Sequence, residues 1–443
     1  MKILIANDID ESLWLRKDGR TWSQRVFWFA DEGDLVILSD HPDEDFLRHV
    51  CGLRGIDPTR IAVRVCPPGR RNGNRLIGPD ALLDPNFIAD IAVGIGADPE
   101  TVSLFPSAMV SEFAARIGLG SRPEGSEFLA QGGSELANSK ATFRALAGGA
   151  GVATAPGAVC RSKDEAVHAM EALIGDGHDV MVKMAHRGAG AGNELVLNTG
   201  GTAPANIGAR HHYRLDAGPD AIGRYWEERW LWASAEGRYP VVVEQVLDVR
   251  QSLYVELLIG DASCDLRGVG VLSYAGGRIA CETLGLAEIP EPQARQAVDD
   301  ATRLADVYRA MGYRGYFCAD AVMTDDMHVL FTEVNARTTT GSHLHEFLDV
   351  QAKAVTREND IVVRQYADSP DWSVRSTEQF LTGLANAGLT YSTASGTGIF
   401  MAIPAFPEQS SGSFLYVIAC KEQEEEEYLR KLDELFRSTP GQG

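Results

Sequence analysis

The sequence lacks long apolar runs, although 44% of its 443 residues are hydrophobic. No run approaches the ~20 residues that a membrane-spanning helix requires. The opening stretch reaches Asn7 after the apolar residues Ile3 to Ala6, which is too short for the apolar core of a signal peptide. We therefore expect a protein with no membrane partner and a cytoplasmic location.

Two familiar patterns are also missing. The seven cysteines lie far apart, without a CxxC pair and in an odd number, which argues against a disulfide framework and against a zinc knuckle. They are expected to be buried, reduced thiols. GxGxxG is absent after the first expected strand, so a dinucleotide-binding Rossmann domain is not expected.

Positive charge is scarce as well. The chain has 41 basic and 62 acidic residues, a net charge of −21. Such a protein repels a phosphate backbone, and no cluster of Lys and Arg interleaved with aromatics counters this locally, so nucleic acid is not an expected partner. A single nucleotide can still bind where a few cations and backbone N–H groups converge on its phosphates.

The length of the chain predicts two or three domains, because hydrophobic cores stop growing well below this size. Short apolar runs alternate with amphipathic stretches at the start, a pattern typical of a small parallel α/β unit. A helix expected over 136–146 and ended by Gly148-Gly149 opens the next domain. The expected fold class is α/β (α+β), with an N-terminal α/β domain over 1–135, a central domain over 136–365, and a C-terminal α+β segment over 366–443.

The first chemical signal is a lysine followed by a glycine-rich loop. A strand expected over 179–184 carries Lys183 and leads into Gly188-Ala189-Gly190-Ala191-Gly192. Small residues leave consecutive backbone N–H groups accessible, so this loop can fold over a polyphosphate. A flexible surface turn explains the alternation of Gly and Ala equally well.

The second signal is a group of oxygen ligands. Asp320 lies on one expected strand, and Glu333 and Asn335 lie on the next, across a short turn. Residues two apart on a strand point to the same face, so three oxygen-bearing side chains would converge. Mg²⁺ prefers such ligands. In the alternative, Asp320 caps a turn and Glu333 is solvated, but Glu333 between Phe331 and Val334 is costly to bury without a cation.

The third signal is an apolar strand, expected over 241–246, that breaks into a polar linker. Its end contains Glu244, Gln245, Val246 and, after one residue, Asp248. Backbone N–H and C=O groups at such a break can meet a purine edge, and a nearby carboxylate can meet ribose hydroxyls. An ordinary strand end is the alternative.

In this order the three signals resemble the ATP-grasp superfamily over residues 136–345. The segment Glu333-Val334-Asn335-Ala336-Arg337 matches that family's metal-binding E-x-N-x-R pattern, and Asp320 stands upstream at the family's separation. Lys183 and its loop look like the second phosphate-binding lysine, and Lys140 looks like the first. The resemblance implies an ATP-grasp fold with an N-terminal parallel α/β pre-domain.

The resemblance also implies roles for single residues. Lys140 and Lys183 would hold the α- and β-phosphates together with the loop residues Gly188, Ala189 and Gly190. The adenine would meet the backbone of Gln245 and Val246 and the side chain of Glu244, while Asp248 is our choice for the ribose over Gln251 and Ser252. Mg²⁺ would be held by Asp320, Glu333 and Asn335, and Arg337 would steady the transferred phosphoryl group, a step that depends on position and charge.

The implied activity is ligation driven by ATP and Mg²⁺: a carboxylate is activated as an acyl phosphate and joined to an amine. The plan of the whole chain resembles the pheganomycin-type peptide ligases, which implies an amino or guanidino acid as donor and a peptide N-terminus as acceptor. A thiol or small amino acid as acceptor, and an ATP-binding protein without turnover, stay open as alternatives. We expect a homodimer, the commonest state of soluble oligomeric enzymes.

The sequence departs from the family pattern at two further places. Ala189 and Gly190 stand where many relatives carry serines, so only backbone N–H groups can donate there. Cys318 stands where some ligases carry an arginine for the tetrahedral oxyanion. Arg250, Arg267 and Arg278 are the remaining candidates for that role.

Overall fold

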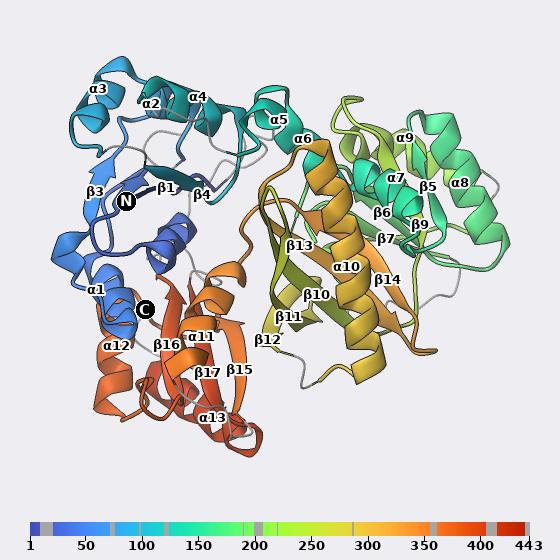
Figure 1. Cartoon of the computed structure of the whole chain (residues 1–443). Coiled ribbons are helices and arrows are strands. Elements are labelled where there is room, and N and C mark those ends of the chain that lie inside the picture. Colours follow the sequence, from blue (N-terminus) through green and yellow to red (C-terminus); the bar gives the residue numbers. More distant parts are fainter. Residues whose placement is uncertain are drawn as a thin grey trace. The chain divides into compact units, whose positions relative to one another are not determined.

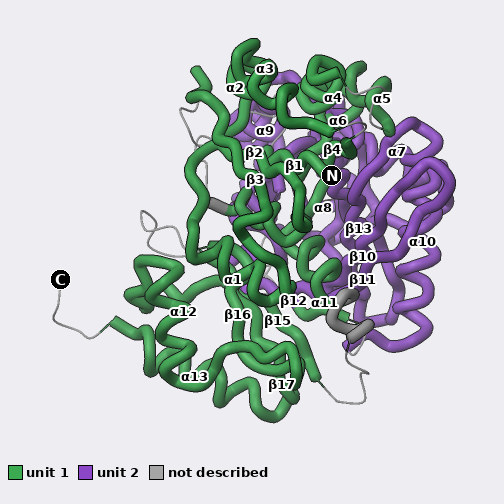
Figure 2. The backbone as a smooth tube through the Cα atoms, turned by 60° about the vertical axis from the view of Figure 1, so that its left-hand side comes forward, with its two compact units in different colours: residues 1–134, 283–285, 337–443 green, residues 135–282, 286–336 purple. Residues whose placement is uncertain are grey.

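The computed structural model describes residues 1–8, 21–70, 76–96, 99–118, 124–188, 190–198, 207–218, 220–285, 288–354, 361–404 and 414–438 (Figure 1). The chain forms two compact units, shown in different colours in Figure 2. Unit 1 contains residues 1–134, 283–285 and 337–443, and unit 2 contains residues 135–282 and 286–336. Both the first and the last of the three predicted domains lie in unit 1, and the division into three domains stays a prediction.

Unit 1 opens with a parallel four-stranded sheet in the order β3-β2-β1-β4. Its strands are β1 (Lys2–Ile5), β2 (Leu35–Leu38), β3 (Ala62–Val65) and β4 (Glu100–Ser103). The central strands β1 and β2 are apolar and almost entirely buried, as expected for a sheet covered by helices. The helical elements of this part are η2 (Thr21–Phe29), α1 (Glu44–Arg54), η3 (Pro58–Arg60), α2 (Pro79–Leu82), α3 (Pro85–Val93), α4 (Ala108–Arg116) and α5 (Ser126–Ala130). The predicted parallel α/β pre-domain is thereby confirmed, although β4 was not anticipated.

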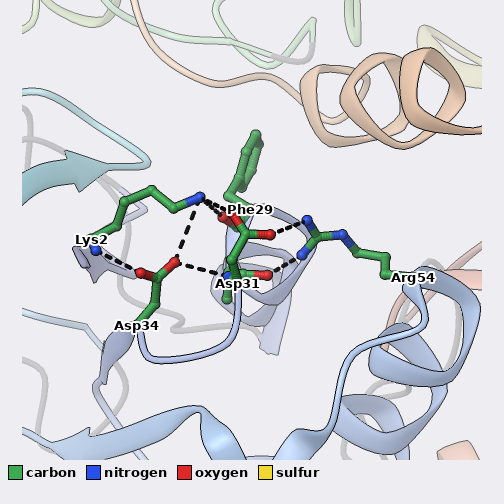
Figure 3. A network of polar contacts seen from close by, with 6 residues as sticks. Lys2, Phe29, Asp31, Asp34 and Arg54 are labelled. Carbon is green, nitrogen blue, oxygen red and sulfur yellow. Dashed lines mark hydrogen bonds and ion pairs between the residues drawn. The ribbon is translucent and has the colours of Figure 1, made fainter. Parts of the chain in front are cut away.

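A polar network fixes the start of β1 (Figure 3). The Lys2 ammonium group contacts Asp31 at 2.8 Å and donates to the Phe29 carbonyl at 2.7 Å, while the Lys2 backbone N–H donates to Asp34 at 2.6 Å. Arg54 at the end of α1 reaches the other oxygen of Asp31 at 2.8 Å. The network therefore connects β1, η2 and α1 to the turn that precedes β2.

The C-terminal part of unit 1 contains three antiparallel strands in the order β15-β17-β16. Its elements are α11 (Ser342–Ala354), β15 (Ile361–Ala367), α12 (Thr377–Asn386), β16 (Gly398–Ile403), β17 (Leu415–Lys421), η4 (Glu422–Glu424) and α13 (Glu425–Phe436). The indole N–H of Trp28 in η2 donates to the carbonyl of Ala402 in β16 at 2.9 Å. Segments that are distant in the sequence therefore share the buried interior of unit 1.

Unit 2 contains a five-stranded sheet in the order β5-β9-β6-β7-β8. The strands are β5 (Gly157–Cys160), β6 (Val180–Met184), β7 (Asn193–Leu197), β8 (His211–Arg214) and β9 (Val241–Gln245), and the helices α8 (Lys163–Gly175) and α9 (Ala221–Ala233) pack on one face. Val180 and Val182 contribute to the core under these helices, whereas Met181 belongs to a separate apolar cluster. Because strand residues alternate, Lys183 points to the same face as Met181, away from the helices.

The other strands of unit 2 form an antiparallel group with the order β14-β13-β10-β11-β12. Its strands are β10 (Val249–Ile259), β11 (Cys264–Ala275), β12 (Arg278–Leu284), β13 (Gly315–Thr324) and β14 (Val329–Asn335), and the long helix α10 (Glu291–Met311) packs against it (Figure 1). The predicted hairpin around Gly276-Gly277 and the predicted pair of strands carrying the oxygen ligands are confirmed.

One predicted helix is displaced. The chain forms the short helix α6 (Gly133–Ala137) and then α7 (Lys140–Ala150), instead of one helix over 136–146. The side chain of Ser139 caps α7, and the helix passes through Gly148-Gly149 to end at Gly151, whose φ of 66° is left-handed. Glycine weakens a helix interior but does not stop it, whereas the left-handed position favours glycine strongly.

All seven cysteines are free thiols, as predicted, but Cys264 and Cys281 are half-buried rather than buried. Among the described residues, no helix combines the length and apolar character that crossing a membrane requires.

Candidate nucleotide and metal site

The hairpin of β13 and β14 brings the three predicted metal ligands together. Asp320 lies directly opposite Glu333 in the antiparallel register. The Asn335 side chain donates through Nδ2 to Asp320 Oδ2 at 2.9 Å, which leaves its amide oxygen for another partner. Two carboxylates and an amide oxygen are therefore gathered on one face of the sheet.

The carboxylates are close enough to affect each other. Burial, with the Glu333 carboxylate beside it, raises the pKa of Asp320 well above its usual range. The thiol of Cys318, two residues earlier, donates to Asp320 at 3.6 Å, and burial raises the pKa of Cys318 well above its usual value. Cys318 is therefore a neutral thiol and cannot supply the positive charge of the arginine that some ligases have there.

Lys140 connects the carboxylates to the glycine-rich loop. It is the first residue of α7, buried, and its ammonium group lies 2.8 Å from Glu333 Oε2. The same group donates to the carbonyl of Arg187 at 2.8 Å, just before the loop. The positive end of α7 and the ammonium charge therefore lie beside the predicted metal ligands and the loop.

Lys183 lies in a second buried ion pair. Its ammonium group contacts one oxygen of Glu244 on the neighbouring strand β9, and it donates to the Thr332 carbonyl at 3.3 Å. The other oxygen of Glu244 accepts from Arg144 of α7 at 2.8 Å. Glu244 therefore holds two cations, and both of its oxygens are occupied by protein groups. The predicted contact of Glu244 with the adenine amino group stays a prediction that has to accommodate these bonds.

The glycine-rich loop connects β6 to β7. The Ala191 and Asn193 N–H groups donate to the carbonyls of Gly188 and Gly190, at 3.2 and 3.3 Å. These two N–H groups close turns within the loop, so the expected unbroken row of N–H donors is not available in this conformation. Gly188 and Gly190 lie in the described part of the loop, whereas Ala189 lies outside the described residues.

The predicted adenine linker is similarly constrained. The N–H of Gln245 donates to the carbonyl of Pro156 at 2.8 Å, and the N–H of Val246 donates to that of Asp179 at 3.0 Å. Both N–H groups are engaged, so the expected donation to a purine edge is not available here, and any backbone contact would use the carbonyl groups. Val246 packs against an apolar cluster of Met181, Leu195, Leu197 and Ala209, on the face of the sheet that carries Lys183.

Two predicted residues, Asp248 and Arg337, remain. The side chain of Asp248 is exposed, just before β10. Arg337 follows Ala336 at the point where the chain returns to unit 1, and there its guanidinium lies 5.4 Å from the centre of the Phe105 ring. Of the arginines considered for the oxyanion, Arg250 and Arg278 are exposed and Arg267 is half-buried.

The ligand set fits a magnesium ion. Asp320 and Glu333 offer two carboxylates, and Asn335 offers an amide oxygen. Mg²⁺ binds through one or two carboxylates and completes its shell with water and phosphate oxygens. A divalent cation would also offset the burial and the repulsion from Glu333 that together raise the pKa of Asp320.

Two residues that sequence reasoning missed support this arrangement. Arg144 lies four residues after Lys140, so both share one face of α7, and that spacing was the available signal. Asn138 is buried, and its side chain forms two hydrogen bonds with the backbone of Ala336, donating at 3.3 Å and accepting at 3.1 Å. It thereby attaches the start of α7 to the residue after Asn335. A buried asparagine before a helix cap offers no specific signal in the sequence.

Comparison with known proteins gives the following matches. Residues 23–119 match the family model described as "Pre ATP-grasp domain". A search of curated proteins found no match to the chain.

Several solved structures share the fold over the whole chain. Biotin carboxylase from Campylobacter jejuni, in a complex with a β,γ-ATP compound, is 14% identical, with 98% of this chain and 91% of that chain covered and a TM-score of 0.59. N5-carboxyaminoimidazole ribonucleotide synthetase from Thermus thermophilus is 13% identical, with 100% of both chains covered and a TM-score of 0.57. L-amino acid ligase from Bacillus licheniformis is 13% identical, with 98% of both chains covered and a TM-score of 0.53.

Proposed function

We propose that this chain, which has the ATP-grasp fold with a parallel α/β pre-domain, is an ATP-dependent ligase that forms an amide bond. One observation carries the proposal: Lys140 and Lys183 are two buried lysines, each paired with a carboxylate, that border the group formed by Asp320, Glu333 and Asn335. Two cations beside a divalent-metal ligand set are what binding a nucleoside triphosphate requires.

The proposed reaction has two steps. A carboxylate oxygen of the donor attacks the γ-phosphorus of ATP, the bond to the β-phosphate oxygen breaks, and ADP leaves. The neutral amine of the acceptor then attacks the acyl phosphate carbon, inorganic phosphate leaves, and the nitrogen loses a proton to give the amide.

The chain's own residues position the phosphates in this scheme. Lys140 and Lys183 bind phosphate oxygens, and Glu244 and Glu333 hold these lysines in place before ATP arrives. Arg337 is proposed to steady the transferred phosphoryl group, as the family pattern implies. Mg²⁺, held by Asp320, Glu333 and Asn335, would neutralise charge on the phosphates.

For the substrates, we propose an amino or guanidino acid as donor and the N-terminal amine of a peptide as acceptor, as in the pheganomycin-type peptide ligases. The L-amino acid ligase among the structures of the same fold supports an amine acceptor. The alternatives are a thiol or a small amino acid as acceptor, and ATP binding without turnover. A homodimer remains our expectation for the oligomeric state.

The test incubates the protein with ATP, Mg²⁺, a panel of amino and guanidino acids, and short peptides. Release of ADP and phosphate is measured, and new products are identified by mass. The proposal expects release that requires both a carboxylate and an amine, with a product lighter than the sum of its substrates by one water. Nucleotide binding without release would instead support the binding protein.

A further inference from the structure

Three backbone segments of unit 2 meet at glycines, and two of these segments have no role in the function proposed above. They are the glycine-rich loop at Gly190, the residues before β8 at Gly208, and the turn between β11 and β12 at Gly277. A Cβ added to Gly190 would lie 2.6 Å from the Gly277 carbonyl oxygen and 3.0 Å from that of Gly208. A Cβ on Gly277 would lie 2.1 Å from the carbonyl oxygen of Ala209. We call this contact the glycine junction.

Hydrogen bonds hold the same segments together. The N–H of Arg210 donates to the carbonyl of Gly190 at 3.1 Å. The side chain of Asn193, at the start of β7, donates through Nδ2 to the carbonyl of Gly208 at 2.8 Å. The glycine-rich loop is therefore bonded to the segment on which Gly277 packs, and this packing needs the absence of a side chain at each glycine.

The junction also lies next to the metal ligands. The ring of Tyr274, in β11 just before the turn, contacts Gly208, where an added Cβ would be 3.0 Å from its Cε1 atom. The same ring packs against the apolar cluster of Tyr254, Leu272 and Cys318, and the Cys318 thiol donates to Asp320 at 3.6 Å. The hairpin of β11 and β12 therefore extends from the metal ligands to the glycine-rich loop.

We propose that the glycine junction holds the glycine-rich loop in place for the phosphates of ATP, and that Gly277 is a positioning residue for the nucleotide. This inference rests on the proposed function, because it assigns to ATP the loop whose position it explains. It also accounts for a loop without serine side chains: the hairpin of β11 and β12, rather than side-chain hydrogen bonds to the nucleotide, keeps the loop in position.

The turn itself supplies a matched control. Gly276 and Gly277 both have left-handed φ angles, 56° and 73°, so alanine is strained at either position. An added Cβ at Gly276 has no atom within 4 Å, whereas at Gly277 it collides with backbone. Gly276→Ala therefore reproduces the strain of the turn without disturbing the junction.

The experiment compares Gly276→Ala, Gly277→Ala and Gly190→Ala. It measures the dissociation constant of ATP at equilibrium, kcat, the KM of ATP and of the carboxylate, and the melting temperature. Relief of the collision in Gly277→Ala needs a backbone shift of about 1 Å, and a misplacement of that size can cost about 10²-fold in rate. We therefore expect kcat/KM for ATP to fall about 100-fold, with a weaker ATP affinity and an unchanged KM for the carboxylate.

Gly276→Ala should keep the ATP affinity and kcat within about twofold of the wild type, while the strain of its left-handed φ lowers the melting temperature. Gly190→Ala should reproduce Gly277→Ala, and the double variant should be no worse than either, because both single changes disrupt one contact. Equal ATP affinity in Gly276→Ala and Gly277→Ala would overturn the inference. If Gly277→Ala does not fold, Gly190→Ala provides the test instead. A wild-type affinity for ATP in Gly190→Ala would also overturn the inference. A wild-type protein that binds no ATP would instead refute the proposed function.

Discussion

Replacing Lys183 by methionine separates a structural role of this lysine from a nucleotide-binding one. Methionine keeps most of the apolar stem and removes the ammonium group, which is buried, pairs with Glu244 and donates to Thr332. Breaking a buried ion pair costs about 3–5 kcal/mol when a charge is left without a partner. Glu244 keeps Arg144 at 2.8 Å, so we expect the free energy of unfolding to fall by only about 1–3 kcal/mol.

The same substitution should also weaken the affinity for ATP. A hydrogen bond to a charged group contributes about 1.5–3 kcal/mol, and each 1.4 kcal/mol is a factor of ten in affinity, so ATP should bind roughly 10- to 150-fold more weakly. Urea denaturation measures the free energy of unfolding, and equilibrium titration with ATP measures the affinity.

Two further variants sharpen the comparison. Lys163→Met removes an exposed ion pair with Glu227 in the same unit. It should change neither the free energy of unfolding nor the affinity for ATP. Lys183→Met combined with Glu244→Gln and Arg144→Met removes all three charges of the buried cluster, so stability should recover in part relative to Lys183→Met while ATP affinity does not. If Lys183→Met binds ATP as tightly as the wild type, the lysine is only structural and the proposed phosphate site is refuted.

Three other changes test different parts of the site and fold. Glu333→Gln removes one charge from the metal ligands, so amide formation, followed by product mass, should fall at least about 100-fold while ATP binding stays measurable; unchanged turnover would contradict the metal assignment. Arg144→Met leaves Glu244 with Lys183 alone, so urea denaturation should show a loss of about 1–3 kcal/mol, and a stability equal to the wild type would show that the pair is not important. His49 is half-buried, its Nε2 accepts from the Met401 N–H at 3.1 Å, and desolvation of the imidazole lowers its pKa to about 4, below the value of 6.5 for an exposed histidine. The folded state therefore binds fewer protons, so stability is fully present above pH 6.5 and falls by up to about 3 kcal/mol as the pH drops to 4. His49→Gln keeps the acceptor and should make this decline shallower in denaturation curves at a series of pH values; an equally steep decline would refute the role of His49.

The part of the site that could be predicted from the sequence is the part built by local geometry. Asp320, Glu333 and Asn335 lie on two strands joined by a short turn, and alternation along a strand determines which side chains share a face. The hairpin around Gly276 could be predicted equally well, because turn residues between two apolar runs indicate a hairpin. Their functional roles remain predictions.

The part that could not be predicted depends on contacts between distant strands. Glu244 lies opposite Met181 because β6 pairs with β9, and nothing local to either strand indicates that pairing. The same applies to Gly190 and Gly277, which look like ordinary loop glycines in the sequence. Hydrogen bonding within the chain also removed donors that the sequence appeared to offer, at Gln245 and Val246.

The way in which unit 1 is assembled affects the order in which parts of the chain can fold during synthesis. Its N-terminal part relies on residues that are synthesised last: Trp28 donates to Ala402, and Asp43 accepts from the hydroxyl of Thr377 at 2.6 Å. Domains tend to fold as they emerge, the N-terminal one first. Here the N-terminal segment completes these contacts only after β16 has been synthesised, whereas nearly all of unit 2 lies in one uninterrupted stretch that is synthesised earlier. The middle of the chain can therefore reach its native structure before the beginning does.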